Sequence, residues 1–159
     1  MASTISSANL KVKITEEIIL NGKDRGSSNT LTIGSINEIS TRIVTVTTTE
    51  AEILKFHATD IDAGRYIIGD VRYMRFTNLD DTNFITLTFT NEDSDEVAIK
   101  LDAGQSFIWN GDNSGGLVDV FNATQDADAA SDTAFGSLTN IQADAEASTV
   151  DIEMFVASV

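Results

Sequence analysis

The fold is decided by residues 69–109, which read GDVRYMRFTNLDDTNFITLTFTNEDSDEVAIKLDAGQSFIW. Four short runs rich in β-branched and aromatic residues are separated by polar turns of Asn, Asp and Gly, which are residues that favour tight turns. In the second run Ile85, Leu87 and Phe89 alternate with threonines, the period-2 pattern of a half-buried strand. We therefore expect four antiparallel strands with short loops, a meander that forms the core sheet.

The first run of this stretch differs from the others because it is apolar on both faces. Val71 and Tyr73 are expected on one face and Met74 and Phe76 on the other. A strand with two apolar faces is usually central in its sheet and covered on both sides. This pattern predicts a second layer of structure over each face of the core sheet.

Strand patterns continue on both sides of the central stretch. An Asn21-Gly22 pair marks a tight turn in the first third of the chain. Residues 122–148 are rich in Ala and Asp and predict a long loop, pinned to the core by Phe135 and Leu138. Further strands are expected at residues 10–14, 42–49, 53–56, 117–121 and 150–156. The fold class is all-β, an antiparallel β-sandwich or a jelly-roll-like barrel. We expect a flexible N-terminal segment at residues 1–9 and a single β domain at residues 10–159.

Composition excludes several classes of function. The chain has 159 residues, no cysteine and no proline, and a formal net charge of −15 at pH 7. Such an acidic surface repels phosphates, so neither nucleic acid nor an anionic membrane is an expected partner. No apolar run approaches the roughly 18 residues that a membrane span needs, and the first residues lack the pattern of a secretory signal.

The sequence shows no recognisable catalytic motif. His57 is the single histidine, and without cysteine it has no partner of the kind that metal sites or thiol nucleophiles use. No phosphate-binding loop, nucleophile elbow or dinucleotide fingerprint occurs. We therefore expect a protein that is not an enzyme and that needs no cofactor.

Calcium is the one ligand that the composition allows. Asp60 and Asp62 begin an Asp-x-Asp-x-Gly phrase, but the remaining oxygen ligands of an EF-hand loop do not follow. The acidic segments 91–96 and 126–132 are further candidates. Each of these segments is also typical of a plain Asx turn.

The N-terminal region is the candidate interface. Residues 1–9 are small and polar, and Ile5 is their one bulky apolar anchor. Lys11 and Lys13 alternate with the apolar residues of the first strand, which gives an acidic protein one basic face. Lysines of this kind protect an edge strand from unwanted pairing, or they dock on an acidic neighbour. We expect Ile5, Lys11 and Lys13 to contact a neighbouring subunit.

Four phrases of the chain resemble small β-rich virion proteins of tailed bacteriophages, particularly those of marine and cyanobacterial phages. They are residues 75–80 (RFTNLD), 100–107 (KLDAGQSF), 139–145 (TNIQADA) and 150–158 (VDIEMFVAS). The resemblance implies a virion structural protein, most simply a capsid decoration (cement) protein that binds the major capsid protein and forms homo-oligomers. The alternatives are a tail, neck or fibre component or, from another class, a carbohydrate-binding or adhesin module.

Overall fold

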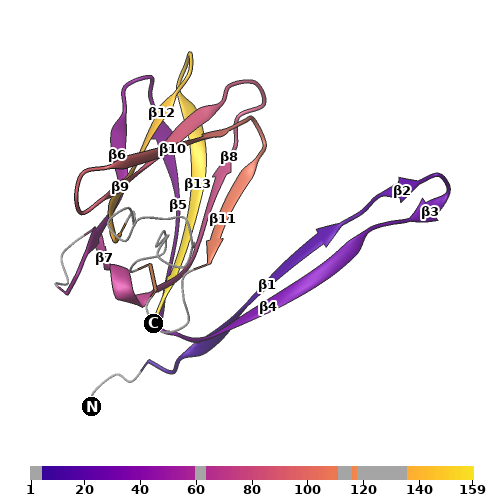
Figure 1. The fold of residues 1–159 in the computed structure, drawn as a ribbon, viewed down its shortest axis with the longest axis horizontal. Coiled ribbons are helices and arrows are strands. Elements are labelled where there is room, and N and C mark those ends of the chain that lie inside the picture. The colour runs from indigo at the N-terminus through magenta and orange to yellow at the C-terminus, as the bar shows by residue number, and fades with distance from the viewer. Residues whose placement is uncertain (1–4, 60–63, 111–115, 118–135) are drawn as a thin grey trace, which may run out of the picture.

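The computed structural model describes residues 5–59, 64–110, 116–117 and 136–159. It is an all-β protein in which two sheets pack face to face, as predicted. One sheet has five strands in the order β10-β9-β12-β6-β7, and the other has four in the order β11-β8-β13-β5. Figure 1 shows the two sheets as a sandwich, with a separate hairpin projecting from one end.

Almost all strand pairs are antiparallel; within the described residues the exception is the short parallel pair of β6 with β7. The five-stranded sheet contains β6 (Ala51–His57), β7 (Arg65–Ile67), β9 (Ile85–Asn91), β10 (Glu96–Leu101) and β12 (Leu138–Ala145). The four-stranded sheet contains β5 (Glu38–Val46), β8 (Val71–Asn78), β11 (Ser106–Asn110) and β13 (Val150–Ser158). The projecting hairpin consists of β1 (Ala8–Glu16), β2 (Ile19–Leu20), β3 (Lys23–Asp24) and β4 (Ser27–Ile36). A 3-10 turn, η1 (Ile68–Asp70), precedes β8.

The core lies between the sheets, where the alternating residues of the sequence are buried. Ile85, Leu87 and Phe89 are buried on β9, as predicted. An aromatic cluster closes one side of this core, because the ring of Phe89 lies 5.5 Å from the rings of both Phe107 and Trp109. The last strand is also confirmed, since the apolar residues of β13 are buried in alternation with Asp151 and Glu153.

The expected meander is wrong. The strands β9 and β10 form a hairpin in the five-stranded sheet, whereas β8 and β11 pair with each other in the four-stranded sheet. The chain therefore crosses between sheets at residues 79–84 and again at 102–105. The alternation that identifies each strand also fits both sheets of a sandwich, because each sheet buries one face. Sequence neighbours on such strands need not be neighbours in a sheet.

The predicted hairpin loop after β8 is instead a crossover that Asn78 holds in place. The Asn78 side chain is fully buried. Its Nδ2 donates to the carbonyl oxygens of Asn83 at 2.9 Å and Leu101 at 3.1 Å. Its Oδ1 accepts from the amide of Asp80 at 2.9 Å. One side chain thus ties together strand ends from both sheets.

Two facing predictions also need correction. Val71 belongs to the core between the sheets with Met74 and Phe76, not to the face of Tyr73. The pairing of β8 with β13 shifts register between Ala157 and Ser158, and a bulge of this kind moves one residue to the other face. On β9 the threonine face is less solvated than expected, since Thr88 is buried. Both faces of β8 are covered, as the sequence predicted.

The loop predicted at residues 122–148 extends too far toward the C-terminus, because its last part contains a strand. Residues 138–145 form β12, which pairs with β9 on one side and β6 on the other. Leu138 is buried in the core, as expected. The expected strand at 117–121 lies outside the described residues except for Leu117, which is buried, and Phe135 lies outside them too.

Candidate assembly interface

The hairpin of residues 8–36, called the arm from here on, is the most distinctive feature of the molecule. Its stem is β1 paired with β4, and its tip is β2 paired with β3. The tip turns at Asn21 (φ 52°) and Gly22 (φ 73°), both left-handed, as a two-residue hairpin turn requires. The predicted Asn-Gly turn is therefore confirmed, and Ala8 and Asn9, expected in a flexible segment, belong to β1.

Two hydrogen bonds fix the local shape of the arm between stem and tip, one across the strands and one within the returning strand. The hydroxyl of Ser27 donates to Glu16 Oε2 at 2.6 Å, and the amide of Gly26 donates to Asp24 Oδ1 at 2.8 Å. A Cβ on Gly26 would lie 2.3 Å from the carbonyl oxygen of Glu16, so only glycine fits there. The arm therefore contains local features that specify its shape beyond the body of the protein.

The register of β1 with β4 divides the stem into two faces. Leu10 lies opposite Ile33 and Val12 lies opposite Leu31, which makes one face apolar. Lys11 and Lys13 lie opposite Thr32 and Thr30 on the other face. This arrangement follows from the period of 2 in both strands.

The base of the arm is anchored on the outer face of the four-stranded sheet. Ile33 and Ile36 are buried against Tyr73 and Ala157 in a second, smaller core. Tyr73 packs edge-on against Phe155 with 5.8 Å between ring centroids. Burial raises the pKa of the Tyr73 hydroxyl, and the nearby Arg75 opposes that shift. The arm is therefore fixed at its base to the sandwich.

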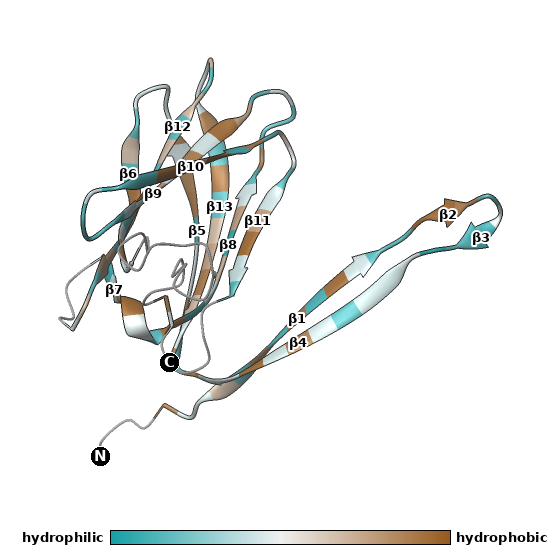
Figure 2. Ribbon diagram, in the orientation of Figure 1, coloured by the Kyte–Doolittle hydropathy of each residue, from teal (hydrophilic) through white to brown (hydrophobic). Residues whose placement is uncertain are grey.

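Beyond the base the apolar residues of the arm are not covered. Ile14 is 44% exposed and Leu31 is 38% exposed, and both lie on the apolar face of the stem. At the tip, Ile18, Ile19 and Leu20 are 52%, 78% and 56% exposed. Figure 2 shows this apolar character along β1 and at β2. A groove of about 300 Å³ separates the stem from the sheet face that bears Ile108 and Phe155.

The outer face of β5 is a second exposed apolar surface. Ile39 and Ile43 are 64% and 63% exposed, and Thr41 and Thr45 lie between and beside them on the same face. The strand is at the edge of its sheet, since β13 is its one partner within the described residues. Scattered exposed apolar residues are ordinary, but several on one arm and one edge strand are typical of a contact surface.

The predicted interface residues lie at this arm. Ile5 precedes β1 and is 70% exposed. Lys11 and Lys13 are exposed on the polar face of the stem. The sequence did not indicate that residues 15–31 extend the same surface outward, although the apolar run at 18–20 beside the Asn-Gly turn was a usable signal.

The predicted cation ligands receive no support. Asp60, Asp62 and the segment 126–132 lie outside the described residues. The turn between β9 and β10 is an Asx turn, because Asn91 Oδ1 accepts the amides of Asp93 at 3.0 Å and Asp95 at 2.6 Å. Among the residues that the structure describes, no group of His, Asp and Glu is placed to hold a metal ion.

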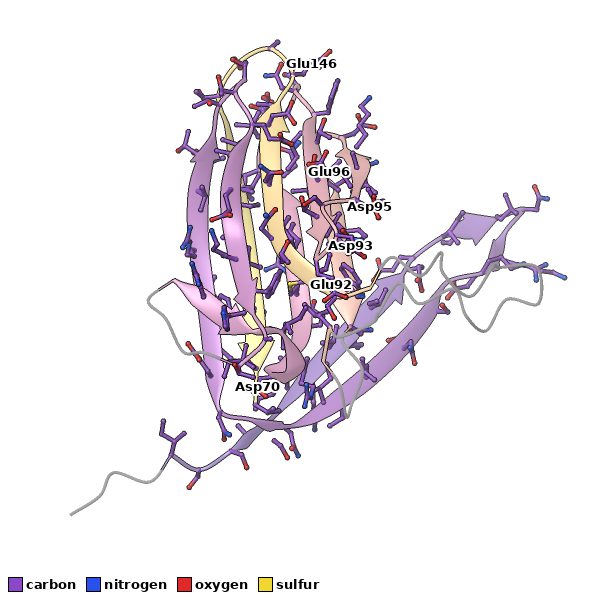
Figure 3. All side chains as sticks on the ribbon, turned by 60° about the vertical axis from the view of Figure 1, so that its left-hand side comes forward. Asp70, Glu92, Asp93, Asp95, Glu96 and Glu146 are labelled. Carbon is purple, nitrogen blue, oxygen red and sulfur yellow. The ribbon has the colours of Figure 1, made fainter. Side chains whose placement is uncertain are left out.

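Charge is distributed unevenly between arm and body. The arm carries four basic and three acidic residues, whereas the rest of the chain carries six basic and 22 acidic residues. Figure 3 shows part of the acidic body, including the four labelled side chains Glu92, Asp93, Asp95 and Glu96 of the β9–β10 turn. A nearly neutral arm thus projects from a strongly acidic body.

Comparisons with known proteins give no family. No family model matches the chain, and no curated protein matches it. A solved structure with some similarity is a protein of Bacillus endospore appendages, which form a family of disulfide-linked pili. Its sequence is 11% identical, the TM-score is 0.43, and the match covers 100% of this chain and 95% of that chain. Within the described residues, no helix has the length and apolarity needed to cross a membrane.

Proposed function

We propose that this protein is a non-enzymatic structural subunit of a virion, and that it uses the arm to attach to neighbouring subunits. The observation that supports this most directly is the arm itself. It is anchored at its base by Ile33 and Ile36, yet Ile14 and the tip residues 18–20 remain exposed. A hairpin that is fixed at its base and has an uncovered apolar surface is suited to reach across to another protein.

The place in the virion that we propose is the outer shell, where a decoration protein would bind the major capsid protein. This part of the proposal rests on the resemblance of residues 75–80, 100–107, 139–145 and 150–158 to phage virion proteins. A protein that binds the assembled lattice but not free subunits stabilises the shell by mass action. A tail, neck or fibre position would use the same arm with a different partner.

The carbohydrate-binding alternative has less support. Such modules usually present aromatic rings to solvent, and the aromatic side chains that the structure describes are buried or half-buried. Phe89, Phe107 and Trp109 pack on one another, and Tyr73 and Phe155 lie at the base of the arm. We therefore propose an assembly role in preference to a lectin role.

The experiment that tests this proposal shortens the arm without disturbing the sandwich. Ile14 and Asn29 are partners in register, so residues 15–28 can be replaced by Asn-Gly, which closes the strands with a two-residue turn. We expect the variant to melt within about 2 °C of the parent, because the exposed residues that it removes contribute little to the core.

Binding is then measured by co-sedimentation with empty capsids of a tailed phage that were assembled without the protein. The parent protein should bind, and the shortened variant should bind at least about ten-fold more weakly, a loss of roughly 1.4 kcal/mol. Equal binding by both proteins would contradict an attachment role for the arm. If neither binds capsids and the parent also stays monomeric at high concentration, the structural role is wrong.

A further inference from the structure

The edges of the two sheets differ in how they are protected. Edge strands in natural proteins are usually short, bulged, or guarded by charged residues and proline. The strands β7 and β11 are short, with three and five residues, and β10 carries Glu96 and Lys100. On the arm, β1 carries Lys11 and Lys13. These edges have protection of the usual kinds.

Two long edges have less of this protection. The arm strand β4 has ten residues, none of them charged and none proline. Its bulge lies at the base, between Ile33 and Ile36, and Ser27 to Ile33 pair with β1 without a break. The sandwich strand β5 has nine residues, and its register with β13 runs without a bulge from Glu38 to Val46. The charged residues of β5, Glu38 and Arg42, line the groove toward β6 and β7 and protect the inner side of this edge. Its outer face carries only Ile and Thr. Both strands present backbone groups that a further strand could pair with.

From the uncharged, regular part of β4 and the uncharged outer face of β5, we propose that β4 of one copy adds to the β5 edge of a second copy and extends its four-stranded sheet. This proposal rests on the assembly role proposed above and names the partner surface as a second copy of this chain. Main-chain hydrogen bonds supply affinity in such strand addition, and alternate side chains supply specificity. Each copy carries one donor strand and one acceptor edge.

The side-chain pattern of the two strands matches. On β4, Asn29 and Leu31 lie on the apolar face of the arm, and on β5, Ile39, Thr41 and Ile43 lie on the outer face. Because both strands have a period of 2, pairing in register places Leu31 beside the exposed isoleucines. Ile14 on β1 then extends the same apolar face one strand further.

The partner is a second copy because the arm cannot reach β5 of its own chain. Asn37 alone separates β4 from β5. The base of the arm is fixed at Ile33 and Ile36, and from there the stem runs away from the sandwich (Figure 1). Charge favours the same partner, since the nearly neutral arm of one copy would lie on the strongly acidic body of another.

The absence of cysteine allows a direct test. One single-cysteine variant carries Asn29→Cys on the arm, and a second, of different size through a fused tag, carries Thr41→Cys on β5. Both positions are exposed. Equal amounts are mixed at high concentration, oxidised and analysed without reductant. The matched control replaces the β5 variant by Val97→Cys, on the edge strand β10 of the other sheet.

We expect a mixed disulfide dimer between the arm and β5 variants, well above that formed with the β10 control. A second measurement follows self-association by sedimentation. Ile43→Lys places a charge on the proposed edge and should weaken association by roughly ten-fold, whereas Val97→Lys should leave it unchanged. Equal crosslinking to β5 and β10, or equal effects of the two lysines, would overturn the pairing of β4 with β5. If capsid binding still depended on the arm, the assembly role would stand while this partner surface would be wrong.

Discussion

Replacing Phe89 by alanine tests the architecture of the sandwich directly. Phe89 is 1% exposed on β9, an interior strand of the five-stranded sheet, and its ring contacts Phe107 and Trp109, which belong to the opposite sheet. Removal of a buried Phe side chain costs about 3–5 kcal/mol, because burial is lost and a cavity remains. Two aromatic pairs are lost as well, each worth about 0.5–1.5 kcal/mol, which favours the upper part of that range.

The loss is large beside the roughly 5–15 kcal/mol that stabilise a typical domain. For a chain of this size it corresponds to a fall in melting temperature of roughly 6–20 °C. Urea unfolding followed by Trp109 fluorescence measures both the midpoint and the slope. The matched control is Val97→Ala, at the position opposite Phe89 in the β9–β10 register but 40% exposed, which should cost about 1 kcal/mol or less. Similar losses for the two variants would refute the placement of Phe89 between the sheets.

Three further predictions concern the connections and the acid limit of stability. Asn78→Ala should cost about 1–3 kcal/mol in urea unfolding, because the carbonyls of Asn83 and Leu101 lose a buried donor; an unchanged midpoint would contradict that role. Amide donors from Asn83 and Thr82 hold the pKa of Asp80 below its usual range. The stability contributed by the ionised Asp80 is therefore complete above the pKa of the unfolded state and is lost as the pH falls through the lower pKa of the folded state. Asp80→Asn should make the urea midpoint less dependent on pH in the acid range; the same pH profile in both proteins would contradict this prediction. Gly116→Ala should cost at least about 1 kcal/mol in thermal unfolding, because Gly116 has φ +62° and a Cβ would lie 2.5 Å from the carbonyl oxygen of Ile68; equal melting would show that the segment adapts.

The strands themselves were predictable because burial and period depend on local sequence. Ile85, Leu87 and Phe89 alternate with threonines, and the last strand alternates apolar with acidic residues. The strand β12 was missed, although Ile141, Ala143 and Ala145 alternate with polar residues, because alanine has low strand propensity. Here the two neighbouring strands, β9 and β6, override the propensity of the segment.

The assignment of strands to sheets was not predictable in the same way. The links after β8 and after β10 are polar and short, as in hairpins, yet each crosses to the other sheet. The buried donor of Asn78, which joins β8 to the end of β10, is a contact between residues 23 positions apart. A local sequence pattern does not reveal a contact between residues so far apart. The sequence therefore predicted a turn but not the sheet to which the next strand belongs.

The arm illustrates the same limit for the candidate interface. Its turn at Asn21-Gly22 and its strand patterns are local and could be predicted. Its projection from the sandwich depends on the packing of Ile33 and Ile36 against Tyr73 and Ala157, which lie far away in the sequence. The sequence therefore predicted an interface at Ile5, Lys11 and Lys13 but could not show that the exposed apolar surface extends to the tip.

The energetics of the arm argue for a partner. A two-stranded hairpin is marginally stable in water, and three or more strands with one apolar face are needed for independent stability. The base of the arm is stabilised by the second core. Beyond Val12 and Ile33 the stem has only two strands, and its apolar face is exposed to solvent. Addition of the arm to the β5 edge of a neighbour would satisfy free main-chain groups of β4 and bring Leu31 into side-by-side contact with Ile39 or Ile43. The features that make the outer arm costly in a monomer are thus the ones that would stabilise it in an assembly.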